Sequence, residues 1–123
     1  MRLISTILAV LVLAAPVARA ESQSDAAPTT AVANEAAQER KYQDCMSQAQ
    51  HAPKAGLKQA MDWEKAGGGD AARHCVAASY MGLKQYDDAA MELERIAETM
   101  PHVKAPIMAQ LFYQAAQAWM QME

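Results

Sequence analysis

The chain has 123 residues, a length that fits one small domain, and 20% of them are charged. Its 14 acidic residues outnumber its 11 basic ones, so the formal net charge at neutral pH is −3. Charges of both signs are mixed along the chain, without the basic patch that binding to nucleic acid or anionic lipid requires, and we set both kinds of partner aside.

The first 20 residues have the pattern of a secretory signal peptide. Arg2 precedes an almost wholly apolar run over residues 3–15, and Ala18-Arg19-Ala20 supplies a small-x-small cleavage pattern. An uncleaved membrane anchor is the weaker alternative, because this run is shorter than the roughly 20 residues that span a bilayer. We expect a soluble mature chain over residues 21–123 in the periplasm or outside the cell. Its net charge would be −5, since Arg2 and Arg19 leave with the signal peptide.

Residues 21–33 are small, polar and interrupted by Pro28, with no periodic apolar pattern, and they predict a flexible linker. From Asn34 onward the good helix formers Ala, Gln, Glu, Met, Leu and Lys dominate, and no window alternates with period two. We therefore predict an all-α domain over residues 34–123.

Cap signals and apolar stripes predict the first two helices. The first begins at the N-cap Asn34, and the second begins at Pro53, a residue suited to a first helical turn. The second helix ends at the glycines of residues 67–69. The residues predicted to face the core are Tyr42, Cys45, Met46 and Ala49 in the first helix, and Gly56, Ala60 and Trp63 in the second.

Three more helices follow. The third is capped by Asp70 and ends near Gly82, the fourth opens at Asp87 and closes at Pro101, and the last covers residues 105–122. Their predicted core residues are Val76, Ala77 and Tyr80, then Ala89, Ala90, Leu93, Ile96 and Ala97, then Met108, Leu111, Phe112, Ala115, Ala116 and Trp119. Short connections between them favour packing of consecutive helices as antiparallel neighbours.

Internal repetition is the most informative feature of the sequence. The segment over residues 70–101 resembles a tetratricopeptide repeat along its full length, through Ala77, Tyr80, Tyr86, Ala89, Leu93, Ile96 and Pro101. The flanking segments match more loosely. The resemblance implies an α-α superhelix of about two and a half helix pairs. The alternative is a helical bundle whose Ala and aromatic spacing matches by chance.

The only two cysteines, Cys45 and Cys75, permit a single intramolecular bridge in a compartment where disulfides persist. In the fold implied by the resemblance this bridge joins the first and third helices, which are neighbours there. The alternative is a pair of free cysteines buried as small hydrophobic residues.

No catalytic motif or phosphate-binding loop is present, so the sequence predicts no enzyme and no cofactor. The alternative function is a small periplasmic copper- or zinc-handling protein, suggested by nine methionines and three histidines. Its ligand set would be Cys45, His51, His74 and Cys75. Against it, His74 and Cys75 are adjacent on a predicted helix and diverge by about 100°.

The resemblance implies a protein-protein interaction adaptor or scaffold. In tetratricopeptide proteins the first helix of each pair lines a concave groove that holds a segment of a partner protein. The residues that would line it here are His74, Ala78, Met81, Tyr113, Gln117 and Met120. This weakly charged face suits an apolar or mixed segment.

The end of the chain is apolar. Trp119, Met120 and Met122 would leave an exposed apolar edge on the last helix. We expect either self-association through this helix or a natural chain that continues beyond Glu123.

Overall fold

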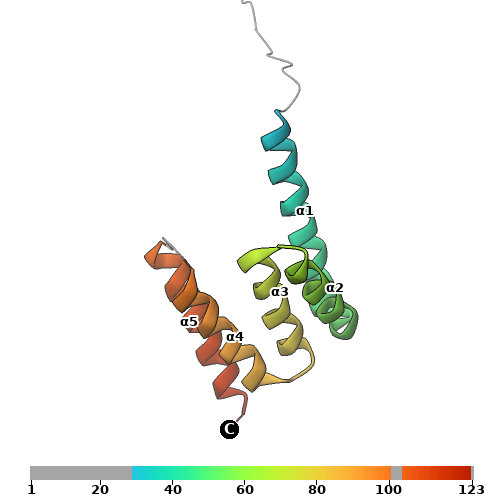
Figure 1. The fold of residues 1–123 in the computed structure, drawn as a ribbon. Helices are drawn as coiled ribbons and strands as arrows, with labels where there is room; N and C mark the ends of the chain where they lie inside the picture. The colour runs from blue at the N-terminus through green and yellow to red at the C-terminus, as the bar shows by residue number, and fades with distance from the viewer. Residues whose placement is uncertain (1–28, 101–103, 123) are drawn as a thin grey trace, which may run out of the picture.

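The computed structural model describes residues 29–100 and 104–122, and their regular structure is entirely α-helical (Figure 1). The five helices are α1 (Thr30–His51), α2 (Pro53–Lys65), α3 (Gly69–Gly82), α4 (Tyr86–Thr99) and α5 (Ala105–Met120). The prediction of an all-α fold with five helices is confirmed for these residues. The predicted signal peptide lies outside them, as do residues 21–28 of the predicted linker.

Helix α3 lies at the centre, with α1 and α2 on one side and α4 and α5 on the other (Figure 1). Each helix packs against the next one in the chain, and α1 also packs against α3. The tetratricopeptide superhelix remains a prediction. None of the helices in the described ranges is long and apolar enough to cross a membrane.

Three predicted helix starts are wrong, although α4, which begins at Tyr86 and not at Asp87, differs by one residue only. Helix α1 begins at Thr30 and not at Asn34, so the last four residues of the predicted linker are helical. These residues contain no Gly or Pro, and adding a residue to an existing helix costs little. Helix α3 has Gly68 as its N-cap, and Asp70 lies in its first turn. The turn before α3 is tight because Gly67 and Gly69 take positive φ angles of 89° and 58°, which glycine adopts readily.

The core has two parts, one on each side of α3. The first joins α1, α2 and α3 through Cys45, Ala60, Trp63, Ala72, Cys75 and Val76. The second joins α3, α4 and α5 through Ala77, Ala89, Ala90, Leu93, Ile96, Ala97, Leu111, Ala115 and Ala118. All five core residues predicted for α4 are buried, which confirms its apolar stripe. The many alanines allow the helix backbones to approach closely.

The closest approach lies at Ala49 on α1. A Cβ atom on Gly56 of α2 would lie 2.7 Å from the backbone nitrogen of Ala49 and 2.9 Å from its Cα. A Cβ atom on Gly82, at the end of α3, would overlap the carbonyl oxygen of Ala49. Glycine at both positions therefore lets three helices meet at one point.

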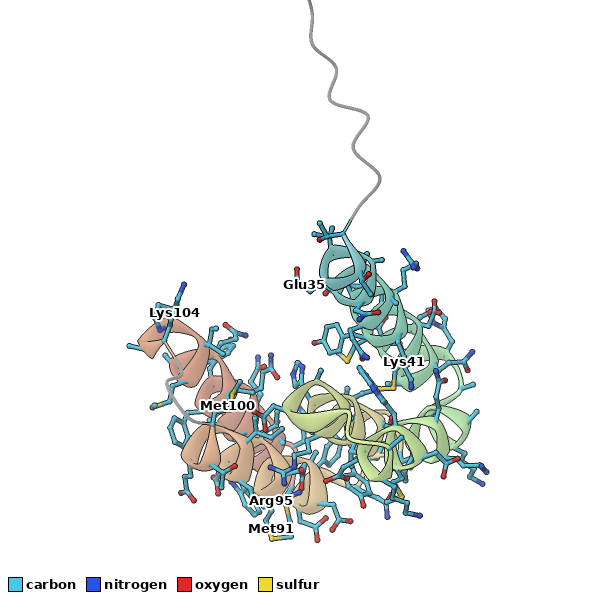
Figure 2. The ribbon with its side chains drawn as sticks, turned by 45° about the horizontal axis from the view of Figure 1, so that its top comes forward. Glu35, Lys41, Met91, Arg95, Met100 and Lys104 are labelled. Atoms are coloured by element: carbon cyan, nitrogen blue, oxygen red, sulfur yellow. A yellow bond between two sulfur atoms is a disulfide. The ribbon has the colours of Figure 1, made fainter. Side chains whose placement is uncertain are left out.

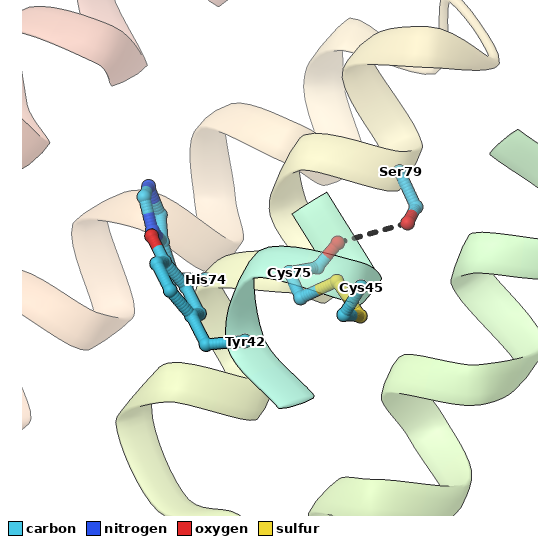
Figure 3. Close-up of a disulfide and its surroundings, with 5 residues drawn as sticks. All are labelled: Tyr42, Cys45, His74, Cys75 and Ser79. Carbon is cyan, nitrogen blue, oxygen red and sulfur yellow. Dashed lines mark hydrogen bonds between the residues drawn. A yellow bond between two sulfur atoms is a disulfide. The ribbon is translucent and has the colours of Figure 1, made fainter. Parts of the chain in front are cut away.

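A disulfide joins α1 to α3, as predicted. Cys45 and Cys75 are fully buried, with their Cα atoms 6.1 Å apart (Figure 3). The neighbouring hydroxyl of Ser79, also buried, donates a hydrogen bond of 2.8 Å to the carbonyl oxygen of Cys75. The bridge holds the first helix against the centre of the fold.

Helix α5 is less buried than predicted. Leu111, Ala115 and Ala118 are buried. The other predicted core residues of this helix, Met108, Phe112, Ala116 and Trp119, are exposed, so their prediction as core is wrong. Among the described helices α4 is the main neighbour of α5, and one neighbour covers only part of a wide apolar face. The predicted apolar edge at the end of α5 is exposed in the structure, with Met120 70% and Met122 55% accessible.

Candidate partner-binding groove

An open groove of about 800 Å³ is bounded by α1, α3 and α5 and by the end of α4. Its volume is in the range of natural ligand sites. The two sides of this groove differ in chemistry, and His74 lies on α3 between them.

The α1 wall is polar and acidic. Asn34 and Gln38, and Glu35 and Glu39, are each four residues apart, so they share one helix face that ends at Tyr42. The first four of these side chains are exposed. Figure 2 shows Glu35 on the side of α1 that faces α5.

The opposite wall is mainly apolar. It is formed by Ile96 of α4, by Met100, the C-cap of α4, and by Pro106, Ile107 and Leu111 of α5. Ile107 is 47% exposed, although it is a large aliphatic side chain. This wall therefore offers apolar surface that a partner could cover.

His74 connects the two walls. Its Nδ1 lies 2.7 Å from the hydroxyl of Tyr42 on α1, and its Nε2 lies 2.9 Å from Oε1 of Gln114 on α5. An amide oxygen can only accept, so Nε2 of His74 donates to Gln114, whereas the Tyr42 hydroxyl can either donate to Nδ1 or accept from it. The rings of Tyr42 and His74 are stacked with centroids 6.0 Å apart (Figure 3).

A second, smaller hollow of about 410 Å³ lies beyond this bridge. His74 and Gln114 line both hollows, so their hydrogen bond lies between them. Met46 and Ala49 of α1 and Leu93 of α4 also line the smaller hollow.

The structure brings together four of the six residues predicted to bind a partner. His74, Ala78, Met81 and Gln117 line the smaller hollow. Tyr113 and Met120 line neither hollow, and they are 59% and 70% exposed. Tyr113 shares part of a helix face with the groove-lining Gln117, whose amide donates a hydrogen bond of 3.1 Å to the Tyr113 hydroxyl, but its ring lies outside the hollow.

Sequence reasoning missed both walls of the large groove. The spacing of Glu35, Glu39 and Tyr42 signals one helix face, but nothing local shows that this face lies opposite Ile107 and Leu111. The linker was predicted to extend to residue 33, so the predicted start of α1 lies four residues after the actual start at Thr30.

The basic residues near the α1 wall, Lys41 and Arg73, do not line the large groove. Lys41 extends its Nζ over the ring of Trp63, 5.2 Å from the centroid, and so lies toward α2 and away from the groove. Arg73 of α3 pairs with Glu64 of α2 at 3.2 Å and with Asp70 at 3.6 Å. The charged side chains that line the large groove are therefore all carboxylates, namely Glu35, Glu39 and Asp70.

The acidic wall also affects Tyr42. Burial raises the pKa of the Tyr42 phenol, and the negative charge of Glu39 raises this pKa further. Glu39 itself accepts a hydrogen bond of 2.6 Å from the amide of Gln43, which leaves its charge uncompensated by that neighbour.

The residues considered as metal ligands do not form a common set. Cys45 and Cys75 are oxidised to a disulfide and supply no thiolate, and His74 uses both ring nitrogens within the protein. His51 is exposed, with its Nδ1 2.9 Å from the carbonyl oxygen of Ser47. No cluster of three or more His, Cys, Asp or Glu side chains suited to a metal ion is found in the described ranges.

Comparisons with protein-family models, with curated proteins and with solved structures found no significant match to this chain. The resemblance to tetratricopeptide repeats thus rests on the quoted residues.

Proposed function

We propose that this chain is an exported, tetratricopeptide-like adaptor that binds a segment of another protein in the groove between α1, α3 and α5. The proposed role is non-catalytic. The observation that carries the proposal is the groove of about 800 Å³, with exposed apolar surface on its α4–α5 wall.

The proposed export rests on two features. Residues 1–20 have the pattern of a signal peptide, and the buried Cys45–Cys75 disulfide suits an oxidising compartment. Both features support the proposed periplasmic or extracellular location.

The hydrogen bonds that join the walls of the groove through His74 favour a role in binding over a role in catalysis. His74 makes hydrogen bonds to Tyr42 and Gln114 and so links three helices that line the groove. Such a link keeps the walls in place before a partner arrives, which lowers the entropic cost of binding. A preformed groove of this kind suits recognition of a short segment.

A pull-down from envelope extract tests the proposal, with the oxidised protein as bait and two variants that each place one charge on exposed apolar surface. Ile107→Glu alters the α5 wall, whereas Met91→Glu alters α4 outside the hollows (Figure 2). Both side chains are about half exposed, so neither change should unfold the domain.

The expected result is one protein that is captured saturably by the wild type and by Met91→Glu but lost with Ile107→Glu. The captured protein, once purified, should bind the bait directly in titration calorimetry at one site. Capture of the same proteins by all three baits, or of none by any, would refute binding in this groove.

A further inference from the structure

The two walls of the groove call for an occupant with two different faces. Across the groove from the carboxylates of Glu35 and Glu39 lie the aliphatic side chains of Ile107 and Leu111. A segment that fills this space must place apolar side chains against α5 and leaves another set of side chains facing α1.

We propose that the partner segment is basic and amphipathic, with apolar side chains against the α4–α5 wall and Lys or Arg side chains against Glu35 and Glu39 of α1. This inference rests on the proposed function and specifies the chemistry of the partner. It differs from the sequence-based expectation of an apolar or mixed segment, because the α1 wall became visible only in the structure.

Charge complementarity carries the choice of a basic partner. Glu35 and Glu39 are one helical turn apart and both are exposed, so a bound cation can reach them without desolvation of a buried charge. No Lys or Arg side chain lines this groove among the described residues, so nothing basic there competes for the two carboxylates. An acidic segment would meet the charges of Glu35 and Glu39 and would be repelled.

The spacing of the two carboxylates also fits such a segment. A rise of 1.5 Å per residue places Glu35 and Glu39 about 6 Å apart along the axis of α1. Side chains two residues apart on one side of an extended strand are separated by about 6.6–6.8 Å. A segment in which basic and apolar residues alternate would therefore face both walls at once.

Selection from a phage-displayed library of random dodecapeptides tests this proposal, because the library offers the groove peptides of every charge and polarity. The target is the oxidised protein purified from cells that express the full 123-residue chain, and phage that bind Ile107→Glu are removed beforehand. Peptides that depend on the groove should be enriched in Lys and Arg and should carry apolar residues between them.

The enriched peptide is then synthesised with a fluorescent label, and its affinity is measured by anisotropy. The double variant Glu35→Gln/Glu39→Gln should raise its Kd about five- to twentyfold at low ionic strength. The matched control Asp44→Asn/Glu98→Gln removes the same charge from exposed positions that line neither hollow and should change Kd less than twofold. Raising the salt concentration from 0.05 M to 0.5 M should weaken binding to the wild type and have little effect on the Glu35→Gln/Glu39→Gln variant.

Each outcome decides one question. Groove-dependent peptides that are neutral or acidic, or a Kd that the Glu35→Gln/Glu39→Gln change leaves unaltered, would overturn the basic partner while the groove remains a binding site. An equal loss of affinity in the Asp44→Asn/Glu98→Gln control would overturn it as well, because attraction would then depend on net charge alone. Failure to enrich any peptide that discriminates against Ile107→Glu would count against the proposed function itself.

Discussion

Reduction of the Cys45–Cys75 disulfide should lower the melting temperature of this protein by about 15–30 °C. The bridge connects residues 30 positions apart, and both cysteines are fully buried. In the chain-entropy model, closing a loop of this length removes about 12 cal/mol/K from the unfolded state, which is about 3.6 kcal/mol at 25 °C.

A destabilisation of this size is large for such a small domain. A domain of 60–100 residues loses about 4–8 °C of melting temperature per kcal/mol. Total stabilities are about 5–15 kcal/mol, so the bridge supplies a large share of the whole. The structure adds a reason for this dependence, because the first 12 residues of α1 are exposed and Cys45 lies where the helix first becomes buried.

The assay is thermal unfolding followed by circular dichroism at 222 nm. Because the cysteines are buried, the protein is reduced in denaturant, refolded with reductant present, and checked for two free thiols. A Cys45→Ala/Cys75→Ala variant should melt at the same temperature with and without reductant, which controls for effects of the reductant on other groups. Melting temperatures of oxidised and reduced wild type within about 3 °C of each other would refute the reasoning.

Three further predictions concern stability. Gly56→Ala should lower the free energy of unfolding by about 1–2 kcal/mol in urea unfolding, because its Cβ would overlap the backbone of α1. The control Ala55→Gly, at the neighbouring exposed position, should cost about 1 kcal/mol through helix propensity alone. A Gly56→Ala protein more stable than the wild type would contradict the close approach of α1 and α2. Leu93→Ala should lower the free energy of unfolding by about 2–5 kcal/mol, because this side chain is only 2% exposed. In the same assay, Met91→Ala at an exposed position of α4 should lower it by less than about 0.5 kcal/mol. Equal losses of stability in the two variants would argue against the α3–α4–α5 core. The pKa of Tyr42 is raised in the folded protein, so its contribution to stability is present below the unfolded pKa near 10 and is lost as pH rises through the folded pKa. Alkaline unfolding, measured by tyrosinate absorbance and circular dichroism, should therefore depend less on pH above about 10 in Tyr42→Phe, and an unchanged pH dependence would show that burial of this phenol does not matter.

Local signals in the sequence predicted several helix ends and the apolar stripe of α4. Pro53 begins α2, Gly82 ends α3, and the stripe from Ala89 to Ala97 is buried as predicted. These features depend on the backbone preferences and apolar spacing of neighbouring residues, which the sequence contains directly. The start of α1 was missed because Asn34 was taken as the N-cap, whereas the N-cap is Thr29, which is also a suitable residue type but makes no capping hydrogen bond.

The groove could be predicted only in part. The sequence predicted that His74, Ala78 and Met81 share one face of α3, and these residues line the smaller hollow, while their binding of a partner stays a prediction. The large groove combines Glu35 of α1 with Ile107 of α5, residues that are more than 70 positions apart. Their juxtaposition depends on how α1 and α5 are held relative to α3, which no local pattern specifies.

The sequence by itself determined the all-α class, the five helices and the single possible disulfide, because helical periodicity and a count of two cysteines are properties of the chain. Only the tertiary structure decided which apolar faces meet. Met108 and Phe112 match core spacing as well as Leu111 does, yet they are exposed because α5 is covered mainly by α4. An apolar stripe shows that a helix has a surface to bury, whereas the number and position of its neighbours determine how much of that surface is buried.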